Sequence, residues 1–368
     1  MLDMEKEMTV FNVPADFQTE TLNELNRINQ YNSKFKVNEV YGQISVGEIY
    51  ASGRMVGSLP KADIITLEKY VTTCNQYDIQ FNYTLNASCM GNLDVDDKSI
   101  KQLEVFINEL TDIGINSYTI ALPSLIDIVQ SIKPKAIIKA SAICEINSTE
   151  KALHYKNRNI KRMVVDPDIT LRFDILKDIC NVFDGTVEII ANNVCLKNCP
   201  YKMFHYNHEA HCSKDDHLNK KATYYYHKCA LQKANDLSSY IKLNWIRPED
   251  LHFYYDMGIR SFKLQGRNSI NGANLVNVIQ AYFSESYDGN LMDLLTLFNP
   301  YNKFQPYIDN KKLNGYINRF YENPAACNGL CSECNYCMSY TKECTDTIKL
   351  QELNGYAKKL YNAYNTIT

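Results

Sequence analysis

Short runs of β-branched and aromatic residues alternate along most of the chain with longer stretches that have the apolar spacing of amphipathic helices. Eight runs have the length and composition of buried strands, and they cover residues 40–46, 80–86, 118–122, 136–141, 162–166, 187–192, 240–244 and 261–264. Helical stretches such as 98–111 and 171–182 lie between them. Repeated strand-helix units predict an α/β fold, a TIM-type (β/α)8 barrel; an open, doubly wound sheet has the same local pattern and is the alternative.

The same pattern divides the chain into three regions. Residues 1–36 are polar and rich in asparagine, and they predict a lead-in to a barrel that covers residues 37–298. A long connection within the barrel, residues 195–239, carries several cysteines and histidines, and excursions of this length generally carry function. Residues 299–368 predict a small cysteine-rich C-terminal region.

Length, composition and charge restrict the classes of protein to which this chain can belong. The chain has 368 residues, of which 45% are hydrophobic, and this is enough to bury a large core. It has no apolar run of about 18 residues. Its first residues are acidic and lack the order of a signal peptide, so we expect a cytoplasmic protein without membrane contact. A net charge of −3 and a pI near 6.2 argue against a bulk attraction to nucleic acid.

Thirteen cysteines indicate metal ligation rather than disulfide bonds, because cytoplasmic thiols are kept reduced and the number is odd. A first group follows the predicted sixth strand and consists of Cys195, Cys199, Cys212 and Cys229. Four thiolates are the usual ligand set of a 4Fe-4S cluster, so this group is a candidate cluster site. The alternative is that one or two of its members are buried structural cysteines.

A second group packs four cysteines into eleven residues: Cys327, Cys331, Cys334 and Cys337. So tight a set wraps a zinc ion or a cluster more readily than it forms unstrained disulfides. The close spacing favours a second 4Fe-4S cluster, and zinc is the alternative. The first three also have the spacing of the radical S-adenosylmethionine triad. That triad belongs after the first barrel strand, where residues 47–59 contain no cysteine.

Polar side chains occur near the end of almost every predicted strand. In a barrel the loops after the strands gather on one face, where the active sites of this fold lie. Apolar residues would fill a purely structural barrel mouth better. Five of the candidates are cationic, which predicts an anionic small-molecule substrate or donor. We expect catalytic roles for Asp166, His205, Lys263 and Arg267, and substrate-binding roles for Arg54, Lys139, Asn192, Asn244 and Arg247.

On the last predicted strand, the direction in which the side chains point can be predicted. Lys263, Gln265 and Arg267 alternate along this strand and its exit, so they point to the same side. The neighbouring apolar residues would pack against helices, which predicts that Lys263 faces the barrel interior. A buried lysine must reach an anion or water to offset its desolvation, and an ion pair with Asp166 or Glu249 is the structural alternative.

Two local sequences link the chain to a known family. Gly47-Glu48 and Ser52-Gly53-Arg54 follow the first predicted strand, and the cysteine-bearing loop begins directly after the sixth. In the order of its strands and of these local sequences, the chain resembles peptidase family U32, the collagenase-like family, over about residues 38–270. The chain departs from the family where many members have Ser-Gly-Arg-Cys after strand six, since it has Cys-Leu-Lys-Asn-Cys-Pro at 195–200.

The resemblance implies a function. Better-understood U32 relatives look like 4Fe-4S proteins that hydroxylate a ring or a nucleobase without dioxygen, in ubiquinone synthesis and in RNA modification. We therefore expect an iron-sulfur-dependent modifying enzyme that acts on an RNA base, a peptide or a small aromatic compound. A U32-type peptidase is one alternative, although no Gly-x-Ser-x-Gly or His-Glu-x-x-His motif is present. A non-catalytic iron-sulfur scaffold or electron-transfer protein with a partner protein is the other.

Overall fold

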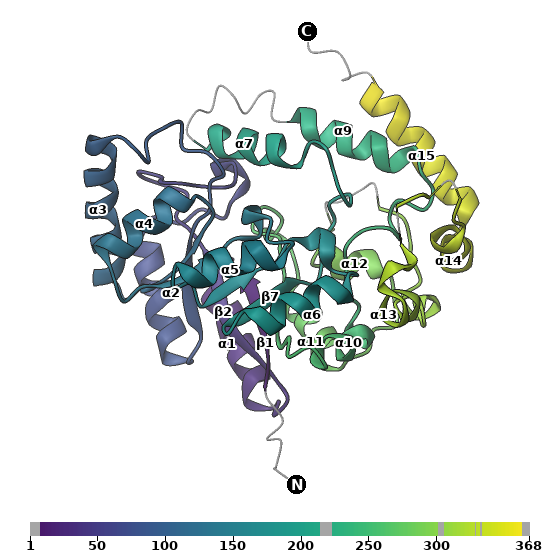
Figure 1. The fold of residues 1–368 in the computed structure, drawn as a ribbon, viewed down its shortest axis with the longest axis horizontal. Coiled ribbons are helices and arrows are strands. Elements are labelled where there is room, and N and C mark those ends of the chain that lie inside the picture. Colours follow the sequence, from purple (N-terminus) through teal and green to yellow (C-terminus); the bar gives the residue numbers. More distant parts are fainter. Residues whose placement is uncertain (1–7, 214–222, 301–304, 328, 332, 363–368) are drawn as a thin grey trace.

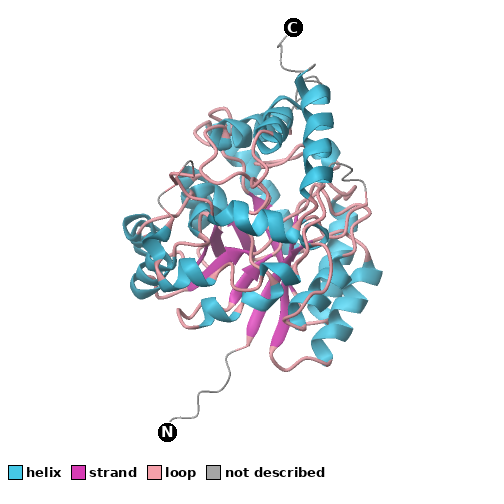
Figure 2. Cartoon of the chain, turned by 90° about the vertical axis from the view of Figure 1, so that its right-hand side faces the viewer, coloured by secondary structure: helices cyan, strands magenta, loops and turns pink. Residues whose placement is uncertain are grey.

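Eight parallel strands close into a barrel inside a layer of helices (Figure 2). The computed structural model describes residues 8–213, 223–300, 305–327, 329–331 and 333–362. The strands are β1 (Thr9–Pro14), β2 (Phe35–Gly42), β3 (Gln80–Leu85), β4 (Ser117–Ile120), β5 (Ile137–Ala140), β6 (Arg162–Val164), β7 (Thr186–Ile190) and β8 (Ser261–Lys263). Neighbours pair in chain order, and β1 pairs with β8. The closed ring confirms the predicted (β/α)8 barrel and excludes the open sheet.

The observed strands differ from the predicted set at two places. Strand β1 lies within residues 1–36, so the predicted lead-in is wrong and the barrel begins there. Its core residues Phe11 and Val13 are fully buried, but the run is short and stands in a polar, asparagine-rich region. Residues 240–244 form turns rather than a strand, because β7 pairs directly with β8 and leaves no place between them. Ile241 and Leu243 are nevertheless buried, which explains the apolar pattern.

Helices follow the strands and cover the barrel (Figure 1). Those of the barrel are α1 (Thr19–Gln30), α2 (Ile64–Gln76), α3 (Asp97–Asp112), α4 (Pro123–Ile132), α5 (Thr149–Asn157), α6 (Phe173–Val182), α7 (Lys202–Cys212), α9 (Thr223–Ala234), α10 (His252–Tyr255) and α11 (Leu275–Phe283). Short 3-10 turns are η1 (Val56–Ser58), η2 (Ala142–Cys144), η3 (Pro167–Ile169) and η4 (Pro248–Asp250). Aspartate caps set two of the starts: Asp63 accepts the backbone N–H of Thr66, and Asp96 that of Ser99.

The C-terminal elements pack against the barrel and against the long connection after β7. They are α12 (Leu291–Leu295), η5 (Lys311–Leu313), α13 (Asn318–Glu322), η6 (Pro324–Ala326), α14 (Tyr336–Cys344) and α15 (Thr347–Asn362). Helix α15 lies along α9 (Figure 1). The buried Tyr316 packs on Trp245, with ring centroids 5.3 Å apart, and its hydroxyl donates to the carbonyl of Ile241. These contacts join the C-terminal region to the segment between β7 and β8.

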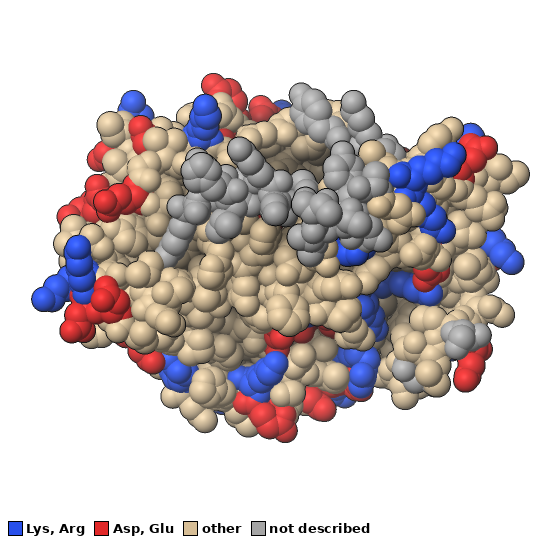
Figure 3. All heavy atoms as spheres, turned by 90° about the horizontal axis from the view of Figure 1, so that it is seen from above, with Lys and Arg blue, Asp and Glu red and all other residues tan. Residues whose placement is uncertain are grey.

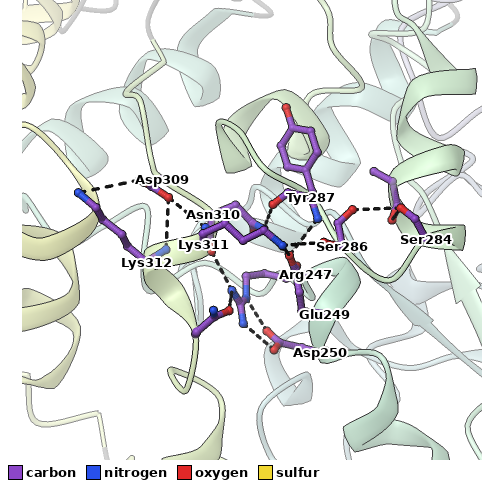
Figure 4. Close-up of polar contacts among 12 residues, drawn as sticks. Arg247, Glu249, Asp250, Ser284, Ser286, Tyr287, Asp309, Asn310, Lys311 and Lys312 are labelled. Atoms are coloured by element: carbon purple, nitrogen blue, oxygen red, sulfur yellow. Dashed lines mark hydrogen bonds and ion pairs between the residues drawn. The ribbon is translucent and has the colours of Figure 1, made fainter.

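Arg247 also connects the barrel to the C-terminal region through hydrogen bonds (Figure 4). Its Nε and Nη2 donate to the two carboxylate oxygens of Asp250, each over 2.8 Å. Its Nη1 donates to the carbonyl of Asn310 over 2.8 Å and to Asn314 Oδ1 over 3.0 Å. The side chain is buried. Arg247 is thus enclosed by protein groups and does not reach a substrate, contrary to the substrate-binding role predicted for it.

We expect Arg247→Met to lower the free energy of unfolding by about 3 kcal/mol, because it leaves the Asp250 carboxylate buried without its partner. The matched control is Lys311→Met. Lys311 also holds a carboxylate, that of Glu249 over 2.9 Å, but its side chain is 37% exposed. An exposed pair contributes less than about 1 kcal/mol. Urea unfolding of the two variants measures the difference, and equal losses would contradict this role of Arg247.

The surface adds two observations. None of the helices formed by the described residues has the length and apolar character needed to cross a membrane. On the described part of the face in Figure 3, basic and acidic side chains are interspersed around a largely uncharged centre. Inside the barrel mouth, by contrast, Arg54, Lys263 and Arg267 line one cavity.

Candidate active site

A cavity of about 560 Å³ opens at the C-terminal ends of the strands. Its walls come from strand ends and from α7, so the barrel brings together residues that are far apart in the chain. Five of the predicted site residues line it: Arg54, Cys195, His205, Lys263 and Arg267. Other polar groups in its lining are Tyr41, Thr84, Asn86, Thr119, Ser141, Asn193, Tyr206, Glu209, Tyr226, Gln265, Asn268, Ser269, Thr296 and Asn299.

Arg267 is held firmly in the cavity wall just beyond β8. Its Nη1 donates to Gln43 Oε1 over 2.8 Å and to the hydroxyl of Thr84, and its Nη2 donates to Asn86 Oδ1 over 2.9 Å. A guanidinium has five N–H donors, so these three hydrogen bonds leave two donors for a ligand. A guanidinium can grip a carboxylate or phosphate with two hydrogen bonds. Burial and the charge of Arg54 lower the pKa of Arg267 to about 10, which leaves it charged at neutral pH.

Helix α7 places His205 and Glu209 one turn apart on the cavity side. Glu209 is buried, and its carboxylate accepts from the hydroxyl of Tyr226 over 3.1 Å. The His205 Nε2 atom lies 3.5 Å from the same carboxylate. Burial alone would lower the pKa of Arg54, but Glu209 together with Tyr206, Tyr226 and Cys195 raises it. Glu209 was not among the predicted site residues; its spacing of four residues from His205 was the available signal.

Lys139 lies below the cavity, within the barrel. Its Nζ is 2.7 Å from Glu39 Oε1 and 2.9 Å from Glu188 Oε2, and all three side chains are buried. Arg162 Nη2 is 2.7 Å from the other oxygen of Glu39. Lys139 is therefore enclosed in an ion network and does not line the cavity, so the structure does not support its predicted role in substrate binding.

Lys263 faces the barrel interior, as its place on β8 predicts. Its Nζ lies 3.8 Å from Glu188 Oε1 and 3.7 Å from the centroid of the Tyr41 ring. The expected structural partners are elsewhere: Glu249 pairs with Lys311, and Asp166 pairs with a lysine of α7. Lys263 is therefore the part of the ion network that reaches the cavity.

Asp166, Asn192 and Asn244 lie outside the cavity lining. Asp166 caps η3 and accepts from Lys202 Nζ over 3.0 Å, while Asn244 Nδ2 donates to Asp168 Oδ1 over 2.9 Å. Asn192 accepts from the backbone N–H of Gln265 and donates to its carbonyl. These contacts hold α7 and the exit of β8 in position, so the predicted catalytic and substrate-binding roles are replaced by positioning roles.

The first group of cysteines is only partly brought together. Burial raises the pKa of the Cys195 thiol, and the nearby thiols of Cys229 and Cys199 raise it further. Cys212 stands at the opposite end of α7, about 15 Å along the helix from the Cys199 side, with its Sγ 3.4 Å from His208 Nε2. Within the described parts of the chain, no three Cys, His, Asp or Glu side chains stand in a metal-binding arrangement. Cys195, Cys199 and Cys229 thus fit a thiolate site in chemistry, and Cys212 does not join them.

The second group lies before and at the start of α14. Burial raises the pKa of Cys337, and the thiols of Cys327 and Cys331 raise it further. The sulfur of Cys337 lies 3.4 Å from the hydroxyl of Tyr316, and that of Cys334 lies 3.7 Å from a guanidinium nitrogen of Arg319. Hydrogen-bond donors of this kind commonly surround ligating thiolates. Residues 328 and 332 of this loop lie outside the described residues.

Comparison with known proteins assigns the family. The family model of peptidase family U32 matches residues 59–325. The chain belongs to peptidase family U32. A curated relative, the "Uncharacterized protease MJ1657" of Methanocaldococcus jannaschii, is 31% identical over 326 residues, which cover 88% of this chain and 95% of the relative. These matches confirm the resemblance predicted from the sequence and extend it well past residue 270.

The fold of this U32 chain agrees with that of a solved member. The structure titled "The Structure of the U32 Peptidase Mk0906" superposes with a TM-score of 0.50 at 12% identity, covering 70% of this chain and 93% of that chain. At this identity the similarity supports the fold alone. The chemistry of the site must therefore be argued from its own residues.

Proposed function

We propose that this U32 chain is an iron-sulfur-dependent modifying enzyme that binds an anionic substrate or donor in the barrel-mouth cavity. Its reaction is an O2-independent hydroxylation or a related group transfer on an RNA base, a peptide or a small aromatic compound. One observation carries the proposal: Cys195 of the predicted cluster site lines the same cavity as Arg54, Lys263 and Arg267. Glu209 is the single carboxylate among the described lining residues, so the cavity favours anions.

Different residues of the site would bind the anion and hold the cluster. The remaining donors of Arg267 would grip a carboxylate or phosphate, and Arg54 adds positive charge to the cavity lining. Cys195, Cys199 and Cys229 would hold the cluster, which supplies electron-transfer or Lewis-acid chemistry when bound. Burial of the cavity in the barrel mouth strengthens each of these electrostatic interactions, because water screens them less there.

The peptidase alternative has less support in the residues. A cysteine or serine peptidase needs its nucleophile within hydrogen-bond reach of a base. Among the described residues, no serine or cysteine of the cavity lining hydrogen-bonds to His205, its one histidine. The scaffold alternative does not account for the three cationic side chains Arg54, Lys263 and Arg267 among the described lining residues.

Anaerobic purification of the full chain tests the proposal. We expect a brown protein with about 4 irons and matching sulfide, or about 8 if the second group of cysteines also holds a cluster. Bound zinc at about one per chain would assign zinc to that second group. A colourless, iron-free protein that cleaves gelatin would establish the peptidase alternative instead. An iron-containing protein that binds no small anion would establish the scaffold.

We expect Arg267→Lys to weaken the binding of malonate, used as a probe anion, by at least about tenfold, because lysine cannot offer two parallel donors. Arg260→Lys is the matched control. Arg260 precedes β8 at the opposite end of the same strand and stacks on Tyr255, with its guanidinium carbon 4.2 Å from the ring centroid. Isothermal titration calorimetry compares the two, and equal affinities would show that Arg267 serves only the fold.

A further inference from the structure

The ion network beneath the cavity has more cations than carboxylates. Both oxygens of Glu39 are taken, one by Lys139 and the other by Arg162. Glu188 accepts from Lys139 over 2.9 Å, while Lys263 stands at 3.8 Å. The two carboxylates are therefore neutralised by Lys139 and Arg162, and Lys263 is the cation left over.

The rest of its surroundings do not compensate the charge of Lys263. Asn12 and Ser261 donate to Glu188 Oε2, and Lys139 also donates to Oε1 over 3.1 Å, so both oxygens of this carboxylate already have a donor. The guanidinium carbon of Arg267 lies 6.0 Å from the same Tyr41 ring that Lys263 contacts. A buried ammonium that lies beside a guanidinium and shares its nearest carboxylate with another lysine is energetically unfavourable. Loss of its proton removes the unfavourable charge.

Glu188 and Tyr41, two neighbours of Lys263, have pKa values far from neutrality. Burial alone would raise the pKa of Glu188, but the charges of Lys139 and Lys263 outweigh it and lower that pKa to about 2. Burial raises the pKa of Tyr41 far above neutrality. Burial, and then the charge of Lys139, lower the pKa of Lys263 to about 7, against about 10.4 for an ordinary lysine. Near neutral pH, Lys263 is thus the member of this set that changes its charge.

We infer that Lys263 is the proton acceptor of the cavity: it loses its proton readily in the free protein and takes one up when a small carboxylate or phosphate anion binds beside Arg267. The inference rests on the anion binding of the proposed function, and it adds a coupled proton. The anion supplies the negative charge that the network lacks, so it favours the ammonium form. By linkage, anion affinity falls as the pH rises through the pKa of the free protein.

Calorimetry of malonate or inorganic phosphate binding to the full chain, in buffers of different ionisation enthalpy, counts the protons. At about pH 8 we expect an uptake close to one proton per anion, since the free amine is then mostly neutral. Lys263→Met should abolish the uptake. His205→Gln should retain it, and this variant separates Lys263 from the other titratable base of the cavity near Glu209 and Arg54. Uptake that persists in Lys263→Met, no uptake in the native chain, or no binding of either anion would overturn the inference.

A second measurement reports the protonation of Lys263 even without an anion. The rate at which acetic anhydride acetylates Lys263, followed by mass spectrometry of its peptide across pH, reports the neutral amine directly. We expect half-maximal reactivity near pH 7 and protection by phosphate, whereas surface lysines should show a midpoint near about pH 10. A midpoint near pH 10 for Lys263 in a protein that still carries iron would overturn this inference and leave the proposed function standing.

Discussion

Lys139→Met should lower the free energy of unfolding by about 5 kcal/mol or prevent folding altogether, the largest loss of stability that we expect from a single side chain. Lys139 donates to Glu39 and Glu188 at once, and both carboxylates lie inside the barrel with at most 1% of their side chains exposed. Methionine fills the space but removes the donor that both carboxylates share, and in a medium of low polarity that loss is costly. Guanidinium unfolding followed by circular dichroism measures the loss.

Two further variants make this result specific. Lys36→Met removes a lysine of β2 whose partner, Asp78, is 93% exposed, and it should cost less than about 1 kcal/mol. Adding Glu188→Gln to Lys139→Met should restore part of the lost stability, because it removes one of the buried charges left without a partner. Additive losses in the double variant would show that Lys139 and Glu188 do not act as a pair.

Cys195→Ala and Cys199→Ala should each remove about four irons per chain and most of the visible absorbance, since alanine cannot replace a thiolate ligand. Cys195 lines the cavity, and Cys199 and Cys229 lie near it. Iron and sulfide analysis of anaerobically purified variants checks the expectation. Unchanged iron in both variants would remove the basis for a cluster in the barrel mouth.

Cys212→Ala decides between the ligand set expected from sequence spacing and the set that the structure favours. Spacing alone includes Cys212, but its sulfur contacts His208 at the far end of α7. We therefore expect Cys212→Ala to retain its iron. A loss as large as that in Cys195→Ala would restore the sequence-based set and require α7 to be placed differently when the cluster is bound.

Whether the role of a site residue could be predicted from the sequence depends on where its partners lie in the chain. The period-two pattern on the last strand placed Lys263 inside the barrel, and Arg267 just beyond it lines the cavity, because alternation is a local property of a strand. Glu39, Glu188 and Gln43 were missed, although they hold Lys139 and Arg267. Lys139 is 100 residues from Glu39 in the chain, and Arg267 is 224 residues from Gln43. Nothing local in the sequence marks such pairs.

The sequence by itself determined the repeated strand-helix order and the two groups of cysteines, because these depend on local periodicity and spacing. It predicted the (β/α)8 barrel with an open sheet as the alternative, and it indicated the family through a resemblance. Only the tertiary structure decided that β1 closes the ring from within the polar N-terminal region, that residues 240–244 form turns, and that Arg247 and Lys139 are enclosed in ion pairs. The reason is that a charged side chain is assigned to structure or to a site by the groups that neutralise it. In a closed barrel those groups come from strands that are distant in sequence.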